Sequence, residues 1–138
     1  MEKLNKDIEE LRNLKLSIHE LRKLYDKIQN EDVKKELKNI IIVSDKIYKE
    51  IVINTQKTSK IKSFTNYYIQ TVQKILNKYY EFNAKKILIE DTEKLLIRIE
   101  EFLPRVNNAF NKIYESLFTD EIADIDAEIK VMLKEIKF

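Results

Sequence analysis

The chain of 138 residues contains no glycine and a single proline, Pro104. Glycine supplies the positive φ angles of tight hairpin turns, and proline fixes φ in many others. A sheet joined by hairpins is hard to build without these residues, so the composition predicts an all-α fold. A chain of this length is the usual size of one domain and can bury a real core. We therefore expect a single helical domain over residues 1–138.

Apolar residues recur at spacings of three and four along almost the whole chain, which is the period of one helix face. The first stripe predicts a helix from about Glu2 to Ile28, and the second predicts a helix that is capped by Asn30 and continues to about Asn54. The short connection requires these two helices to form an antiparallel hairpin over residues 1–54. The expected fold is an antiparallel bundle of about five helices, with this hairpin packed against helices 3 to 5.

The polar stretch 54–59 is predicted to be a loop, with Thr58 or Ser59 capping the third helix. The third helix should end near Asn83-Ala84. Its expected buried stripe is Ile61, Phe64, Tyr68, Val72, Ile75, Tyr79 and Phe82.

The fourth and fifth helices complete the expected bundle. The fourth stripe comprises Leu88, Leu95, Ile99, Phe102, Val106, Phe110, Ile113 and Leu117. Pro104 lies within it and should kink the helix near residues 100–103, because proline removes one backbone hydrogen bond and clashes with the preceding turn. Thr119 is expected to cap the fifth helix. The inner stripe of that helix should be Ile122, Ile125, Ile129, Met132 and Ile136.

Charge is distributed unevenly, although the net charge is only +2. Residues 51–89 carry seven basic groups and one acidic group, whereas residues 90–138 carry seven basic and twelve acidic groups. We expect these two segments to pack together within the molecule, because helices adjacent in sequence usually do. The small net charge is not the signature of a general nucleic-acid-binding protein.

The residues needed for catalysis are scarce. The chain has no cysteine, and its one histidine, His19, lacks the second histidine of a zinc-protease helix. Asp124 and Asp126 superficially match the two-aspartate signature of some phosphotransferases. Residues two apart on a helix point in different directions, so these carboxylates could not converge on one ion or phosphate. The absence of glycine excludes the usual phosphate-binding loops. We expect no catalytic residues, no metal ligands and no cofactor, and we favour a protein that is not an enzyme.

The N-terminus has early acidic residues and no continuous apolar core, so it is neither a signal peptide nor a membrane span. The longest apolar run, residues 40–43, is too short to cross a bilayer. These features predict a cytoplasmic protein.

The third helix offers the best candidate for an interaction surface, because tyrosines outside its stripe lie among lysines. Such a patch could contact phosphate groups, an acidic partner or, peripherally, an anionic membrane. The candidate residues are Tyr67, Tyr80, Lys57, Lys60, Lys62, Lys74 and Lys78.

Residues from about Ile61 to Ile136 resemble the XpaC family, named for 5-bromo-4-chloroindolyl phosphate hydrolysis. The resemblance rests on the run Ile61-Lys62-Ser63-Phe64-Thr65-Asn66-Tyr67-Tyr68, on Ile75-Leu76 and Tyr79, on the helix with Ile99, Phe110 and Leu117, and on the closing residues 125–134. Family members typically have Leu-Pro after the tyrosines, where this chain has Ile69-Gln70, so we expect a more regular helix here. The resemblance implies a helical protein of the bacterial cytoplasm with an XpaC-like core over residues 60–138.

The expected function is therefore that of a non-catalytic helical interaction or scaffold protein, which binds a protein partner or a second copy of itself. One alternative is a weak aryl-phosphate hydrolase, as the family name suggests. Another is a module that binds an anionic surface, either lipid or nucleic acid.

Overall fold

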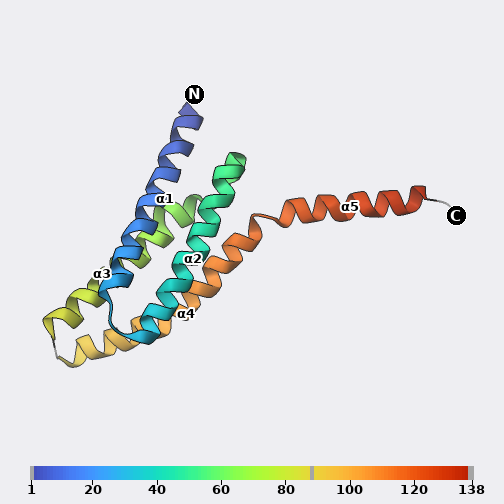
Figure 1. Cartoon of the computed structure of the whole chain (residues 1–138). Helices are drawn as coiled ribbons and strands as arrows, with labels where there is room; N and C mark the ends of the chain where they lie inside the picture. Colours follow the sequence, from blue (N-terminus) through green and yellow to red (C-terminus); the bar gives the residue numbers. More distant parts are fainter. Residues whose placement is uncertain (1, 88, 137–138) are drawn as a thin grey trace.

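The computed structural model describes residues 2–87 and 89–136, and this part of the chain is almost entirely helical, without a β-strand (Figure 1). The five α-helices are α1 (Glu2–Lys27), α2 (Glu31–Ile53), α3 (Ile69–Lys85), α4 (Glu90–Ser116) and α5 (Thr119–Glu135). A 3-10 segment, η1 (Thr55–Ile61), and a π-helical turn, η2 (Phe64–Tyr68), join α2 to α3. The predicted all-α bundle is confirmed.

Helices α1 to α4 form the bundle (Figure 1). The helices α1 and α2 run antiparallel as the expected hairpin, α3 packs along α1, and α4 packs along α2. The contact between α3 and α4 is much smaller than that between α2 and α4. The bundle is therefore closed on three sides and more open between α3 and α4.

The core is made of apolar side chains from α1 to α4 and from the segments between them. Leu21, Leu37, Ile47 and Leu103 are fully buried. Phe64 also lies in this core and packs edge-on against the ring of Phe110, with 4.8 Å between ring centroids. These contacts join the middle of the chain to α4.

The turn between α1 and α2 follows the prediction. Helix α1 ends at Lys27, and the Oδ1 atom of Asn30 accepts a hydrogen bond of 3.1 Å from the backbone N–H of Val33. This bond satisfies one of the free N–H groups at the start of α2.

Residues 54–59 do not form the predicted loop. Residues 55–61 form the 3-10 segment η1, and the Thr58 hydroxyl donates to the carbonyl of Thr55 instead of capping α3. The expectation that Thr58 or Ser59 caps this helix is wrong, because helical turns continue through residues 62 and 63. A helix that does not start afresh leaves no free N–H groups for a cap.

The π-turn η2 changes which residues of α3 face the core. The N–H of Ile69 bonds to the carbonyl of Phe64, five residues back, and both side chains are buried. Tyr68, which was expected in the core, is 44% exposed. The helix is regular from Ile69 onward, but the turn directly before it is π-helical. The Gln70 side chain donates to the carbonyl of Thr65 at 3.0 Å and occupies an acceptor of the widened turn.

Helix α3 ends later than predicted. It continues to Lys85, and Lys86 adopts the left-handed conformation with φ of 50°. A glycine usually occupies this position, but the chain has none. Leu88, placed in the fourth stripe, lies outside the described residues.

Pro104 lies inside α4, which is continuous from Glu90 to Ser116. Figure 1 shows the ribbon of α4 changing direction along its length, as expected for a helix with an internal proline. Beyond the proline, the Asn107 side chain donates to the backbone carbonyl of Glu36 at 3.0 Å and links α4 to α2.

Helix α5 departs most from the prediction. It projects away from the bundle (Figure 1), and none of its residues is buried. The expected inner stripe is therefore on the surface. Thr119 does not cap the helix, because the capping position is Phe118 and no side chain bonds there. Within the described residues, no helix has both the length and the apolar character needed to cross a bilayer.

Candidate functional site

The seven candidate residues do not form one patch. Tyr67 is 62% exposed, and Lys62 and Lys74 are exposed as well. Tyr80 is half-buried against the core, with the Lys27 ammonium 5.7 Å from its ring centroid. Lys78 is exposed and pairs with Glu81 at 3.2 Å.

Lys57 is buried, so it is not part of a surface patch. Its ammonium donates to Glu50 of α2 at 2.7 Å and pairs with Glu121 of α5, and it lies 4.6 Å from the centroid of the Phe118 ring. Burial by itself lowers the pKa of Lys57, but the hydrogen bonds to Glu121 and Glu50 outweigh it and raise the pKa overall. The hydrogen bond from Lys57, assisted by one from Asn54, lowers the pKa of Glu50.

The expected pairing of the basic and acidic segments occurs at the first turn of α5. Lys60 forms an ion pair of 2.8 Å with Asp120, beside the pair between Lys57 and Glu121. The rest of α5 leaves the bundle and covers none of the lysines of α3 (Figure 1).

An apolar groove follows the open side of the bundle between α3 and α4. Two hollows of about 610 and 420 Å³ form it, and Thr71 and Phe102 line both. The remaining lining residues are Tyr67, Tyr68, Val72, Lys74, Ile75, Lys78, Phe82, Leu95, Arg98, Ile99, Arg105, Val106, Ala109 and Phe110. We call this surface the α3–α4 groove. All of its charged lining residues are basic.

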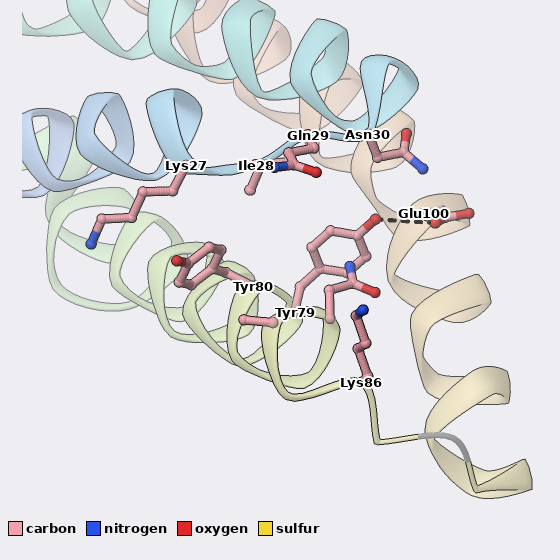
Figure 2. A pocket seen from close by; sticks show the side chains of 10 residues that line it. Lys27, Ile28, Gln29, Asn30, Tyr79, Tyr80, Lys86 and Glu100 are labelled. Carbon is pink, nitrogen blue, oxygen red and sulfur yellow. Dashed lines mark hydrogen bonds between the residues drawn. The ribbon is translucent and has the colours of Figure 1, made fainter.

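A more polar pocket of about 530 Å³ lies at the base of the bundle, where the α1–α2 turn approaches the end of α3. Figure 2 shows Tyr79 and Tyr80 of α3 between Lys27 on one side and Lys86 and Glu100 on the other. The Tyr79 hydroxyl donates to a carboxylate oxygen of Glu100 at 3.2 Å. We call this cavity the base pocket.

Burial raises the pKa of Tyr79, and the nearby Glu100 carboxylate adds to this rise, which a hydrogen bond with Asn83 partly offsets. Tyr79 is therefore a protonated donor at neutral pH and lacks the lowered pKa that would favour a tyrosine nucleophile. Lys27 and Lys86 bring two ammonium groups to the lining, on opposite sides of the two tyrosines, and the Glu100 carboxylate lines the pocket as well.

Reasoning from sequence did not single out Glu50, Glu100 or Arg98. The two glutamates belong to charge patterns typical of solvated helix faces, and only the packing brings them to Lys57 and Tyr79. Arg98 could be recognised only once the space between α3 and α4 was known.

The model of the 5-bromo-4-chloroindolyl phosphate hydrolysis protein family matches residues 4–132. The chain belongs to this family. The match includes α1 and α2, and so extends beyond the residues from 61 to 136 in which the resemblance was seen. No curated protein and no solved structure matches the chain.

Membership of the 5-bromo-4-chloroindolyl phosphate hydrolysis protein family agrees with the resemblance based on the Asn66-Tyr67-Tyr68 helix. In the structure, these three residues belong to the π-turn η2. The most specific part of the family resemblance is thus the turn that sets the register of α3.

Proposed function

We propose that this protein is a non-catalytic helical interaction or scaffold protein of the bacterial cytoplasm, and that α5 is the element through which it binds. The observation that carries the proposal is the exposure of the apolar stripe of α5. Ile122, Ile125 and Ile129 are 66%, 57% and 53% exposed, and Met132 and Leu133 are also exposed. Contiguous apolar surface of this kind marks interaction sites.

Part of the candidate patch supports the same proposal. Tyr67, Lys74 and Lys78 line the α3–α4 groove, where an exposed aromatic ring and two cations border an apolar surface. Aromatic residues are enriched at protein interfaces. We propose that these three residues contribute to a contact, whereas Lys57 serves to orient α5.

The test uses the full chain in gently prepared cell extracts. We expect the wild-type chain to sediment in complexes larger than its own 16.6 kDa. The Ile125→Asp/Ile129→Asp variant should sediment as the single chain, because two charges interrupt the stripe. The matched control is Val131→Asp, which changes an exposed apolar residue on the opposite side of the same helix. A wild-type chain that sediments as a monomer would contradict the proposal.

The second candidate function is hydrolysis of an aryl phosphate in the base pocket. The family description and the pair of ammonium groups from Lys27 and Lys86 favour it. Activity on a chromogenic aryl phosphate should then co-purify with the protein and fall sharply in Lys27→Ala/Lys86→Ala. Lys23→Ala, which removes an exposed lysine that pairs with Glu20, serves as control. Activity that is unchanged in the double variant would exclude this pocket as its source.

A further inference from the structure

We propose that the α3–α4 groove of one molecule binds helix α5 of a second copy of the same chain, so that two copies exchange their α5 helices. This inference rests on the proposed function and names the partner. It joins two exposed apolar features of the described residues, the stripe of α5 and the α3–α4 groove.

Helix α5 has the pattern of a peptide helix that binds in a groove. Ile122, Ile125 and Ile129 are spaced by three and four, so they share one side of the helix. Met132, Leu133 and Ile136 continue this side. Helix-in-groove recognition uses anchors with this spacing. The stripe extends along the whole helix and is uncovered in one copy of the chain.

The α3–α4 groove matches the helix in length and character. The 17 residues of α5 are about 25 Å long at 1.5 Å per residue. The lining residues on the α3 side extend from Tyr67 to Phe82, which spans about 24 Å on the same basis. Apolar residues line both hollows, and Thr71 and Phe102 connect them at the centre.

The charges of the two surfaces are complementary. The charged residues that line the groove are Lys74 and Lys78 on α3 and Arg98 and Arg105 on α4. Helix α5 contains six acidic and two basic residues and has a net charge of −4.

Acidic residues border the apolar stripe of α5 on both sides. Glu128 precedes Met132 by four residues, and Asp126 precedes Ile129 by three, so each acid neighbours a stripe residue. A docked α5 would thus place carboxylates toward both basic edges of the groove. Complementary charge of this kind favours encounter and fixes orientation.

Helix α5 does not occupy the groove of its own molecule. Only Leu117 and Phe118 separate α4 from α5, and their N–H groups bond to the carbonyls of Tyr114 and Glu115. The ion pairs of Lys57 with Glu121 and of Lys60 with Asp120 hold the first turn of α5 against η1. From there α5 projects away from the bundle (Figure 1). Folding back onto its own groove would change this connection and break both ion pairs.

A second copy needs no such change. Each copy supplies one α5 helix and one groove. In a dimer with a two-fold axis, both helices are bound and both grooves are filled, so no further copy can add. We therefore choose a second copy over other occupants.

The chain has no cysteine, which allows a direct test by disulfide formation. Thr71→Cys places a thiol at the centre of the groove, and Ile129→Cys places one at the centre of the α5 stripe. Because both positions are central, the thiols meet whichever way α5 runs. When the two purified variants are mixed and oxidised, we expect a mixed disulfide between the two chains to predominate, as measured by intact mass.

The molar mass of the cysteine-free protein provides the second readout. Light scattering should give twice the 16.6 kDa of one chain for the wild type and for the Val131→Asp control. The Ile125→Asp/Ile129→Asp variant should lose the dimer and scatter as a single chain. Circular dichroism should show that the helical bundle is retained in all three proteins.

Other results would overturn the inference. A predominant disulfide between two chains of the Ile129→Cys variant would mean that α5 pairs with α5. An intramolecular disulfide in the Thr71→Cys/Ile129→Cys double variant, at the mass of one chain, would mean that α5 folds onto its own groove. A monomeric purified wild type would exclude a second copy altogether.

The proposed function and the choice of a second copy as the partner are tested separately. If the purified chain is monomeric but still enters Ile129-dependent complexes in extracts, only the choice of a second copy is wrong. If it is monomeric in both settings, both proposals are wrong.

Discussion

Lys57 is the residue at which the bundle and helix α5 meet. It is a buried lysine, 6% exposed, and its ammonium lies between Glu50 of α2 and Glu121 of α5. A buried charge is tolerated only when it is paired and hydrogen-bonded. Lys57 therefore supports the structure and sets the direction of α5, although its position in the sequence suggests a surface cation.

Replacing Lys57 with methionine should lower the free energy of unfolding by about 2 kcal/mol, because the partly buried Glu50 carboxylate loses its charged donor. Urea denaturation measures this change. The matched control is Lys60→Met, which breaks the exposed ion pair with Asp120 and should change stability little. Equal effects of the two substitutions would contradict the role assigned to Lys57.

The lowered pKa of Glu50 predicts how stability changes in acid. Its pKa in the folded protein lies below the usual 4.5, so Glu50 stabilises the fold fully above pH 4.5. The contribution is lost as the pH falls through the lower folded pKa. The stability difference between the wild type and Glu50→Gln should therefore shrink as the pH drops below 4.5. A difference that stays constant or grows in thermal unfolding at these pH values would contradict this account.

At the scale of single elements, the π-turn η2 sets the register of α3. It brings Ile69 into the core in place of Tyr68, after which Val72, Leu76 and Tyr79 follow at ordinary helical spacing. It also leaves Tyr67 and Tyr68 beside the α3–α4 groove, where their rings pack edge-on with 5.6 Å between centroids. One inserted residue thus turns two tyrosines toward a surface that could bind a partner.

The π-turn should tolerate a proline at position 70, just after its last residues. We expect Gln70→Pro to cost about 1 kcal/mol or less, because the wider turn gives the ring room and already disturbs the regular hydrogen bonds. Gln73→Pro, in the regular part of α3, should cost about 3 kcal/mol. Chemical denaturation of both variants measures the difference, and similar costs would show that the π-turn gives proline no advantage.

Helix α5 should contribute little to the stability of the bundle. In dilute protein, Ile125→Asp/Ile129→Asp should change the free energy of unfolding by less than about 0.5 kcal/mol, since both side chains are exposed. Leu103→Ala, at a fully buried position of α4, should cost about 3 kcal/mol. A large loss of stability in the α5 variant, measured by urea denaturation, would show that its stripe is covered within the chain.

These elements also show how far sequence reasoning reaches. The absence of glycine and the apolar spacing predicted the helices, and Asn30 marked the start of α2 correctly. Periodicity alone could not reveal the π-turn, because its single extra residue depends on how Phe64 and Ile69 pack. The same periodicity shows that α5 is amphipathic, but it does not show whether the apolar side of α5 faces its own bundle.

At the scale of the whole molecule, the four-helix bundle positions three surfaces relative to one another. The base pocket lies at one end of the bundle, and the α3–α4 groove follows one side. Helix α5 leaves from the end of α4 (Figure 1). Among these, the candidate site could be predicted only in part. Sequence reasoning named Tyr67, Lys74 and Lys78, which line the α3 side of the groove. The residues that line its other side, Phe102, Arg98 and Arg105, come from α4, whose placement depends on the fold.

Amide hydrogen exchange of purified full-length protein tests the central claim most directly, namely that α5 is free of its own bundle and available to another chain. In dilute protein, we expect the amides of α5 to exchange much faster than those in the core of α4, because few buried contacts hold α5. Raising the protein concentration should slow exchange in α5 for the wild type but not for Ile125→Asp/Ile129→Asp. Slow exchange in α5 that does not depend on concentration would contradict the account, because it would mean that α5 is covered within its own chain.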